Sequence, residues 1–216
     1  IVSAADAARA RQAVQQAVRT LAGVSVQPGA AVPAVAVLEM VEREGYRLQS
    51  IAMRTVDGLE LPALFATPPG EWAKPATVLI DPESRATLAQ PGAEIDRLAR
   101  RGHIVLAFGP RPSPAGTEEV KAALLGTSYL LSLRAFLVGR PILGMRVDDT
   151  LAALDYVASR VDVDSTRLTL YGRGTAGPVV LHAAALDGRV SHTVVEQGLT
   201  AYRMVVDQPL HRNASE

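Results

Sequence analysis

The chain has 216 residues, of which 48% are apolar and 20% charged, and its 22 basic and 22 acidic side chains leave a formal net charge of zero. This length suits one domain with a single core. The balanced charge excludes the basic surface of a general nucleic-acid-binding protein. The sequence contains no cysteine, which excludes disulfides, thiolate zinc sites and cysteine nucleophiles.

The first 33 residues are predicted to form a separate N-terminal segment. Ala7, Val14 and Leu21 recur at helical spacing within residues 4–22, so we expect an amphipathic helix that ends at Gly23. The Gly, Pro and Ala content that follows is typical of a linker. We therefore divide the chain into residues 1–33, a helix and linker, and residues 34–216, the main domain.

Residues 46–67 predict a β-hairpin. Apolar residues alternate with other residues over positions 59–65, directly after the turn formers Asp57 and Gly58. Pro62 cannot donate a backbone hydrogen bond, so it indicates that this strand lies at an edge of its sheet.

Short apolar runs alternate with helical segments in the rest of the chain. The runs at 77–80, 103–108, 167–171 and 193–195 are typical of strands buried in a parallel sheet. Helices with one apolar face are expected between them, which gives right-handed crossovers. The pattern predicts a three-layer α/β domain with a mostly parallel sheet that a β-hairpin precedes.

The apolar stretch from Ala122 to Val138 is the longest candidate for a membrane span. Lys121 and Arg134 bracket or interrupt it, and it falls short of the ~20 apolar residues that a span requires. We expect a mostly buried helix beside the sheet and no membrane span.

The most informative stretch runs from Arg167 to Asp187. It predicts a short buried strand, a glycine-rich turn and an Ala-rich helix, which is the local geometry of both nucleophile elbows and phosphate-binding turns. In a Gly-x-Ser-x-Gly elbow counted from Gly172, the serine would stand at position 174, where this chain has glycine. The central residue of such an elbow adopts a positive φ, which glycine reaches freely.

The elbow stretch and the segments before it resemble the α/β-hydrolase superfamily, in particular bacterial acetyl xylan esterase-like and prolyl-oligopeptidase-like proteins. The resemblance covers roughly residues 40 to 210 and implies an α/β-hydrolase-like three-layer sandwich, in a carbohydrate-esterase-like protein of extracytoplasmic or secreted location. The segments that carry it, besides the elbow, are Gly139-Arg140-Pro141-Ile142-Leu143-Gly144-Met145-Arg146, Asp155-Tyr156-Val157-Ala158-Ser159-Arg160 and Asp162-Val163-Asp164.

The sequence departs from that family's pattern in four places. Gly174 supplies no hydroxyl to attack an acyl carbon. Residues 81–85 (Asp-Pro-Glu-Ser-Arg) stand where a His-Gly type oxyanion loop would be expected, and their acidic groups disfavour a developing oxyanion. Residues 109–112 (Gly-Pro-Arg-Pro) replace an Asp-Pro-Arg-Gly-like turn. The family's acid and histidine follow later strands, whereas the sequence ends at Glu216, so we expect the C-terminal part of the fold to be missing.

No other side chain is predicted to replace the missing serine as a nucleophile. Thr175 is the nearest hydroxyl, but a register shifted to it would put Arg173 where the sharp turn needs a small residue. We therefore predict no catalytic residue, with Thr175 as a weak candidate, and no metal site. The four histidines are each expected to be structural: His103, His182, His192 and His211.

The same glycines also match the Gly-x-Gly-x-x-Gly fingerprint of dinucleotide-binding proteins. Gly172, Gly174 and Gly177 follow a strand and precede a helix, and Glu196 ends the next strand, where an acidic residue would bind a ribose hydroxyl. A third interpretation is tight packing of the strand against the helix with no ligand.

These observations predict a catalytically degenerate α/β-hydrolase-like domain, which acts as a structural or interaction domain beside a companion domain or subunit. We expect no cofactor and no nucleic-acid partner. The alternatives are a carboxylic-ester hydrolase completed by missing chain, and a dinucleotide-binding domain that uses Gly172, Gly174 and Gly177.

Overall fold

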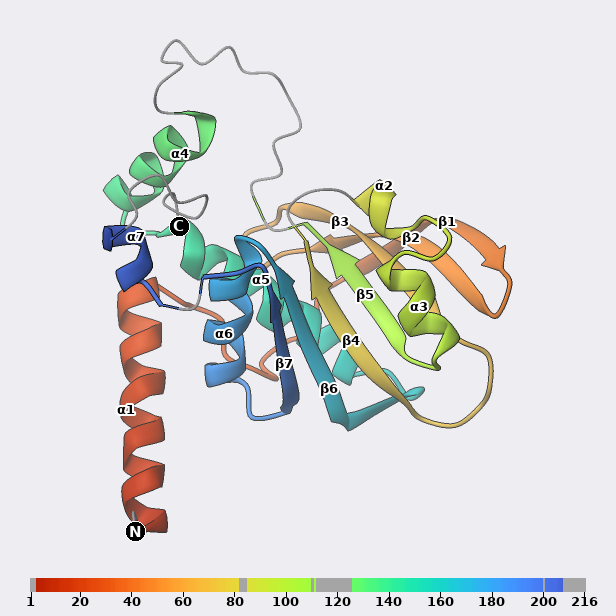
Figure 1. The fold of residues 1–216 in the computed structure, drawn as a ribbon, viewed down its shortest axis with the longest axis horizontal. Helices are drawn as coiled ribbons and strands as arrows, with labels where there is room; N and C mark the ends of the chain where they lie inside the picture. The colour runs from red at the N-terminus through yellow and green to blue at the C-terminus, as the bar shows by residue number, and fades with distance from the viewer. Residues whose placement is uncertain (1–2, 82–84, 110, 112–125, 200, 208–216) are drawn as a thin grey trace.

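The computed structural model describes residues 3–81, 85–109, 111, 126–199 and 201–207. A seven-stranded sheet crosses the domain in the order β1-β2-β3-β5-β4-β6-β7 (Figure 1). The strands are β1 (Val35–Arg43), β2 (Tyr46–Arg54), β3 (Glu60–Thr67), β4 (Lys74–Ile80), β5 (Ile104–Phe108), β6 (Val163–Arg173) and β7 (Val190–Glu196). The helices are α1 (Ala4–Ala22), α2 (Arg85–Leu88), α3 (Glu94–Arg100), α4 (Gly126–Leu137), α5 (Ile142–Ala158), α6 (Ala176–Leu186) and α7 (Arg203–Asp207).

The sheet is antiparallel at one side and parallel at the other. Strands β1, β2, β3 and β5 pair antiparallel, whereas β5, β4, β6 and β7 pair parallel. The predicted hairpin is therefore present as β2 and β3. The predicted mostly parallel sheet with a preceding hairpin is confirmed.

Two features of the antiparallel part differ from the prediction. Strand β1 was not predicted and forms the outer edge. Pro62 lies in β3, which pairs with β2 on one side and β5 on the other, so the edge assignment is wrong. Pro62 is tolerated because β5 pairs only with residues 63–66 of β3, so no bond to β5 is lost at the proline.

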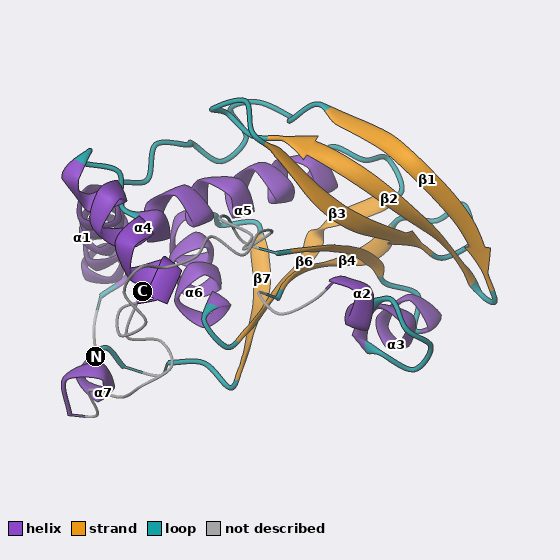
Figure 2. Ribbon diagram, turned by 90° about the horizontal axis from the view of Figure 1, so that it is seen from above, coloured by secondary structure: helices purple, strands orange, loops and turns teal. Residues whose placement is uncertain are grey.

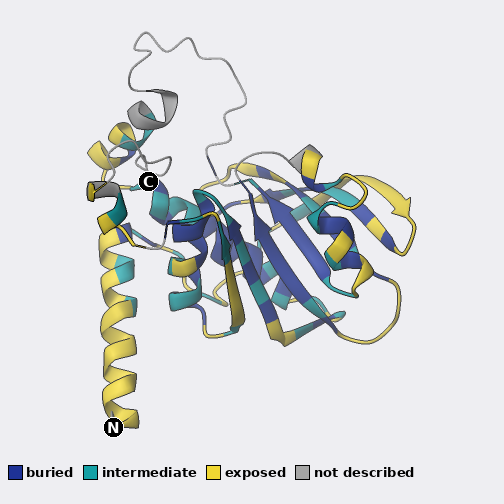
Figure 3. Cartoon of the chain, viewed as in Figure 1, coloured by how far each residue is buried: buried dark blue, intermediate teal, exposed yellow. Residues whose placement is uncertain are grey.

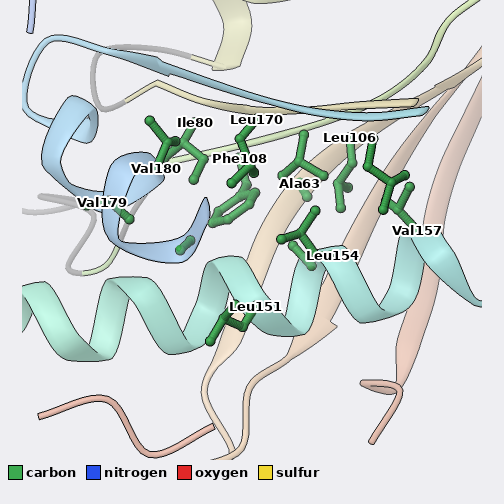
Figure 4. Close-up of a cluster of buried hydrophobic side chains, with 14 of the residues drawn as sticks. Ala63, Ile80, Leu106, Phe108, Leu151, Leu154, Val157, Leu170, Val179 and Val180 are labelled. Atoms are coloured by element: carbon green, nitrogen blue, oxygen red, sulfur yellow. The ribbon is translucent and has the colours of Figure 1, made fainter. Parts of the chain in front are cut away.

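Helices cover both faces of the sheet, as the three-layer prediction requires. In Figure 2, α2 and α3 lie on one face, whereas α1, α4, α5 and α6 lie on the other. The larger core forms under α5 and α6, where Leu151 and Leu154 of α5 point at Phe108 and Leu170 of the sheet (Figure 4). These four side chains are completely buried.

Helix α1 begins and ends where the sequence predicts. Ser3 caps it by accepting a hydrogen bond from the Asp6 amide, and Gly23 ends it with a φ of 69°. Ala22 is the only buried residue of the helix, and Figure 3 shows that most of its surface is exposed. Val24, at the start of the predicted linker, belongs to the larger core. The division of the chain at residue 33 stays a prediction.

Helix α4 corrects one expectation. Over its described C-terminal half, Phe136 and Leu137 are 73% and 75% exposed, so the expectation of a mostly buried helix beside the sheet is wrong there. The helix packs against α5 rather than against the sheet, which leaves its outer side uncovered (Figure 3). Within the described ranges, none of the helices is both long and apolar enough to cross a membrane.

Candidate functional site at the β6–α6 turn

The carboxyl ends of the parallel strands meet at one edge of the sheet. Ile80 in β4 lies level with Phe108 in β5 and with Gly172 in β6, and Gly172 lies level with Val195 in β7. The chain leaves β4 toward α2 and α3 on one face, and it leaves β6 toward α6 on the other face (Figure 1). This reversal between neighbouring strands is the place where open α/β sheets form their ligand crevice.

Gly174 stands at the tip of the turn between β6 and α6. Its φ is 58°, which is the positive value expected for the central residue of an elbow. Its amide donates a hydrogen bond to the Glu196 carbonyl at 2.8 Å, which ties the turn to the end of β7. A Cβ atom added at Gly174 would meet no atom within 4 Å. Conformation, and not lack of space, therefore favours glycine here.

The two flanking glycines allow close packing. A Cβ atom at Gly172 would lie 2.7 Å from the Ala176 carbonyl oxygen, and one at Gly177 would lie 2.9 Å from Cγ1 of Val195. Both positions bring α6 against the strands that flank it. The three glycines are thus accounted for by one positive φ and two tight contacts, without a ligand.

An ionic network fills the space beside the turn. The Arg173 guanidinium bonds to Oδ2 of Asp81 at 3.1 Å and to Oε2 of Glu196 at 3.0 Å. Asp81 directly follows β4, and its side chain is only 3% exposed. The Tyr171 hydroxyl donates a further hydrogen bond to Glu196. Arg173 therefore joins the ends of three strands across the position where the strand connections reverse.

This network shifts the acidity of its members. The Tyr171 hydroxyl, followed by Arg173, lowers the pKa of the Glu196 carboxyl because both stabilise its charged form. Burial, and then the neighbouring Glu196 carboxylate, raises the pKa of Tyr171. Glu196 is therefore held ionised by protein groups that bind its Oε2.

Among the other residues singled out in the sequence, Thr175 directly follows the tip of the turn, whereas the described histidines make local contacts or lie on the surface. Thr175 has a helical φ of −67° and caps α6 without a side-chain hydrogen bond. Nδ1 of His182 lies 2.6 Å from the Pro178 carbonyl oxygen of its own helix, and Nδ1 of His103 lies 3.2 Å from Oγ1 of Thr77. His192 is exposed on β7. His211 lies outside the described residues.

A second polar cluster surrounds Arg111, three residues beyond the end of β5. Its Nε bonds to Oδ2 of Asp149 on α5 at 2.6 Å, and its Nη1 bonds to Asp57 in the hairpin turn. Burial raises the pKa of Asp149 to about 6, although Arg111 opposes the shift, whereas the bond from Arg111 lowers the pKa of Asp57. The sequence pattern did not predict this cluster. Its only signal was a pair of aspartates, Asp148 and Asp149, beside the apolar face of a predicted helix.

Helix α5 uses two further aspartates to hold distant segments. Asp148 accepts hydrogen bonds from the amides of Ser25 and Val26 at 2.9 and 2.8 Å. Asp155 accepts from the Gly29 amide at 2.7 Å and pairs with Arg189 before β7. In the described parts of the chain, no group of three or more acidic, histidine or cysteine side chains is placed to hold a metal ion.

Solved structures of other proteins share this architecture. The structure overlays on a "putative acetyl xylan esterase" from Bacteroides fragilis with a TM-score of 0.68 at 16% identity, over 86% of this chain and 52% of that one. It overlays on an acetyl xylan esterase from Paenibacillus sp. R4 with a TM-score of 0.65 at 20% identity, over 96% of this chain and 63% of that one. The chain has the α/β-hydrolase fold. At these identities the likeness is one of fold.

The sequence comparisons give one curated relative of this α/β-hydrolase-like chain. It is 35% identical over 100 residues to a Bacillus subtilis protein named "Putative hydrolase YtaP", a match that covers 44% of this chain and 29% of that protein. No family model matches the sequence. The chain therefore spans well under two thirds of YtaP and between half and two thirds of the two structural neighbours.

Proposed function

We propose that this α/β-hydrolase-like chain is catalytically degenerate and serves as a structural or interaction domain. The observation that carries the proposal is Gly174 at the tip of the elbow, where the turn has the backbone conformation of a nucleophile elbow but no side chain. Acyl transfer by covalent catalysis requires an attacking oxygen or sulfur atom at this point. A glycine supplies neither.

The surroundings of the turn support the same conclusion. Ester hydrolysis places negative charge on an oxyanion, which hydrogen-bond donors or cations must stabilise. Here the Arg173 cation is already paired with Asp81 and Glu196, and the Asp81 amide donates to the Phe108 carbonyl at 3.2 Å. The carboxylates of Asp81 and Glu196 would repel a developing oxyanion.

An interaction role is supported by exposed apolar side chains where α1 ends and α5 begins. Leu21 on α1 is 80% exposed, and Leu137 at the end of α4 and Val138 after it are 75% and 73% exposed. Large apolar groups gathered on a surface are typical of contacts with another protein or domain. We propose that a companion domain or subunit covers them.

The alternative function is a carboxylic-ester hydrolase, which the names of the structural neighbours favour. Its attacking group would have to be another residue, and Thr175 is the nearest hydroxyl. The dinucleotide alternative is disfavoured because Tyr171 and Arg173 both bond to Oε2 of Glu196, where a ribose hydroxyl would have to compete with them. Calorimetric titration with NAD and NADP that gives no heat would dispose of it.

Hydrolysis of 4-nitrophenyl acetate tests the proposal. We expect the wild-type protein, a Thr175→Ala variant and a Thr193→Ala control, whose change lies on the exposed side of β7, all to hydrolyse the ester no faster than buffer alone. A wild-type rate well above buffer that Thr175→Ala abolishes and Thr193→Ala retains would overturn the proposal in favour of the hydrolase.

A further inference from the structure

A second concave site lies away from the β6–α6 turn. A hollow of about 550 Å³ opens between residues 25–34, the turn at 54–56 and Ala152 of α5. This volume falls within the range of about 300–1,000 Å³ typical of small-molecule sites. None of the residues of the Arg173 network lines it.

The lining is mostly apolar. Val26, Ala31, Pro33, Val56 and Ala152 all contribute to the wall. Most side chains of the 25–34 segment are small or cyclic, although Val26 and Gln27 also line the hollow, so the segment covers α5 without filling the space above it. An apolar ligand that entered would be removed from water on several sides, which favours binding in proportion to the area buried.

Hydrogen bonds to buried groups hold the walls in place. Asp148 binds the amides of Ser25 and Val26, and Asp155 binds the Gly29 amide. The Arg54 amide donates to the Ala34 carbonyl at 2.9 Å, which fixes the far end of the segment to β2. The cavity is therefore formed before a ligand arrives, which reduces the ordering cost of binding.

One cation stands in the lining. Arg54 has a side chain that is 63% exposed, and its ion pair with Glu60 is long, at 3.6 Å, and equally exposed. Such a pair contributes only about 0–1 kcal/mol, so an arriving carboxylate could compete for the guanidinium. The Glu60 carboxylate beside the guanidinium disfavours ligands with several negative charges.

We propose that this hollow binds a small monocarboxylate with an apolar body, whose carboxylate pairs with Arg54. The site would give a domain without esterase activity a ligand-binding function of its own. Because it shares no residue with the β6–α6 turn, the proposal stands or falls independently of catalysis there.

Calorimetric titration with 4-phenylbutyrate tests this inference, with 4-phenyl-1-butanol as the uncharged counterpart. We expect the carboxylate to bind to the wild-type protein, and an Arg54→Gln variant to bind it about tenfold more weakly, as expected for loss of one hydrogen-bonded charge. The affinity for the alcohol should be the same in both proteins. An Ala31→Trp variant, which fills the hollow from its exposed wall, should lose both ligands.

A matched control comes from the same strand. Arg47 in β2 is also exposed and pairs with Glu42 at 2.7 Å, but it lies outside this hollow, so Arg47→Gln should bind 4-phenylbutyrate like the wild type. Absence of binding at millimolar ligand would overturn the proposal. So would equal binding of 4-phenylbutyrate by the wild type and Arg54→Gln, or unchanged binding by Ala31→Trp.

Discussion

Arg173 at the end of β6 places Nη1 3.1 Å from Oδ2 of Asp81, the residue that follows β4. The two strands are neighbours whose onward connections run to opposite faces of the sheet, so this pair bridges the crevice in which α/β folds usually hold a ligand. Asp81 is buried and would be costly to leave without a cation. The edge that other α/β proteins leave open is here joined by a salt bridge.

Two glycines of the turn should respond differently to alanine. Gly174→Ala should cost about 1–2 kcal/mol of unfolding free energy, because an L-residue is strained at positive φ but has room. Gly172→Ala should cost about 3 kcal/mol, because its Cβ would overlap the Ala176 carbonyl. Denaturant unfolding would measure both. Gly188→Ala, with neither constraint, should stay within about 0.5 kcal/mol, and equal losses at positions 172 and 174 would contradict this account.

Removing Arg111 should make stability strongly dependent on pH. Arg111→Gln leaves the Asp149 carboxylate buried without its cation, which should cost about 3–5 kcal/mol near pH 7. The pKa of folded Asp149, already raised to about 6 by burial, should rise further once the opposing cation is gone. The folded variant then takes up a proton that the unfolded chain does not bind until much lower pH. The difference in unfolding free energy between the wild type and Arg111→Gln should therefore shrink as the pH falls from 8 to 5.

Thermal melting of wild type and Arg111→Gln at both pH values measures that deficit. The loss of Arg111 from Asp57 adds a constant cost over this range, because the low pKa of Asp57 keeps this carboxyl ionised and its stabilising contribution fades only below about pH 4. Arg47→Gln, which removes an exposed pair, should cost less than about 1 kcal/mol at either pH. A gap between wild type and Arg111→Gln that widens on acidification would be incompatible with a buried Asp149.

The Tyr171 hydroxyl should control the acidity of Glu196. Tyr171→Phe removes the largest contribution to the lowered pKa of Glu196, so that pKa should move up toward its ordinary value of about 4.3. Carbon-detected NMR titration of the Glu196 carboxyl would follow the change. Arg173→Gln should shift it in the same direction, and a Glu196 pKa that neither substitution moves would argue against the network.

Asp148 should hold the segment after α1 in place. Asp148→Ala removes the acceptors of the Ser25 and Val26 amides, so both amides should exchange with deuterium at least about tenfold faster, as expected for loss of a hydrogen bond to a charged group. The Gly29 amide, which Asp155 holds, should change less. Asp164→Ala, at a carboxylate that bonds only to nearby Thr166, serves as the control. Exchange at Ser25 equal to that in the control would refute the role given to Asp148.

The sequence predicted the elements whose pattern is local. Continuous apolar runs located β4, β5 and β6 closely, and the glycine spacing located the turn and its positive φ. Strand β1 escaped because a register shift between Val37 and Glu39 breaks its alternation, and its outer position leaves nearly every side chain exposed. The alternation of apolar and polar residues that predicts a strand is therefore not continuous over β1.

The polar clusters could not be predicted because their partners lie far apart in the chain. Asp149 meets Arg111 from 38 residues away, and Arg173 meets Asp81 from 92 residues away. Periodicity assigns such residues to a solvated helix face or a strand end. Only the assembled sheet shows that Asp81 and Asp149 are buried beside arginines.

The aspartates of α5 also determine when parts of the chain can become ordered. Their bonds to Ser25 and Gly29 join residues 123 and 126 positions apart, so each closes a very long loop. Such contacts become favourable only after the sheet has formed and α5 has docked on it. The N-terminal segment is synthesised before the rest of the domain. Its backbone can therefore form these hydrogen bonds only after the second half of the domain has folded.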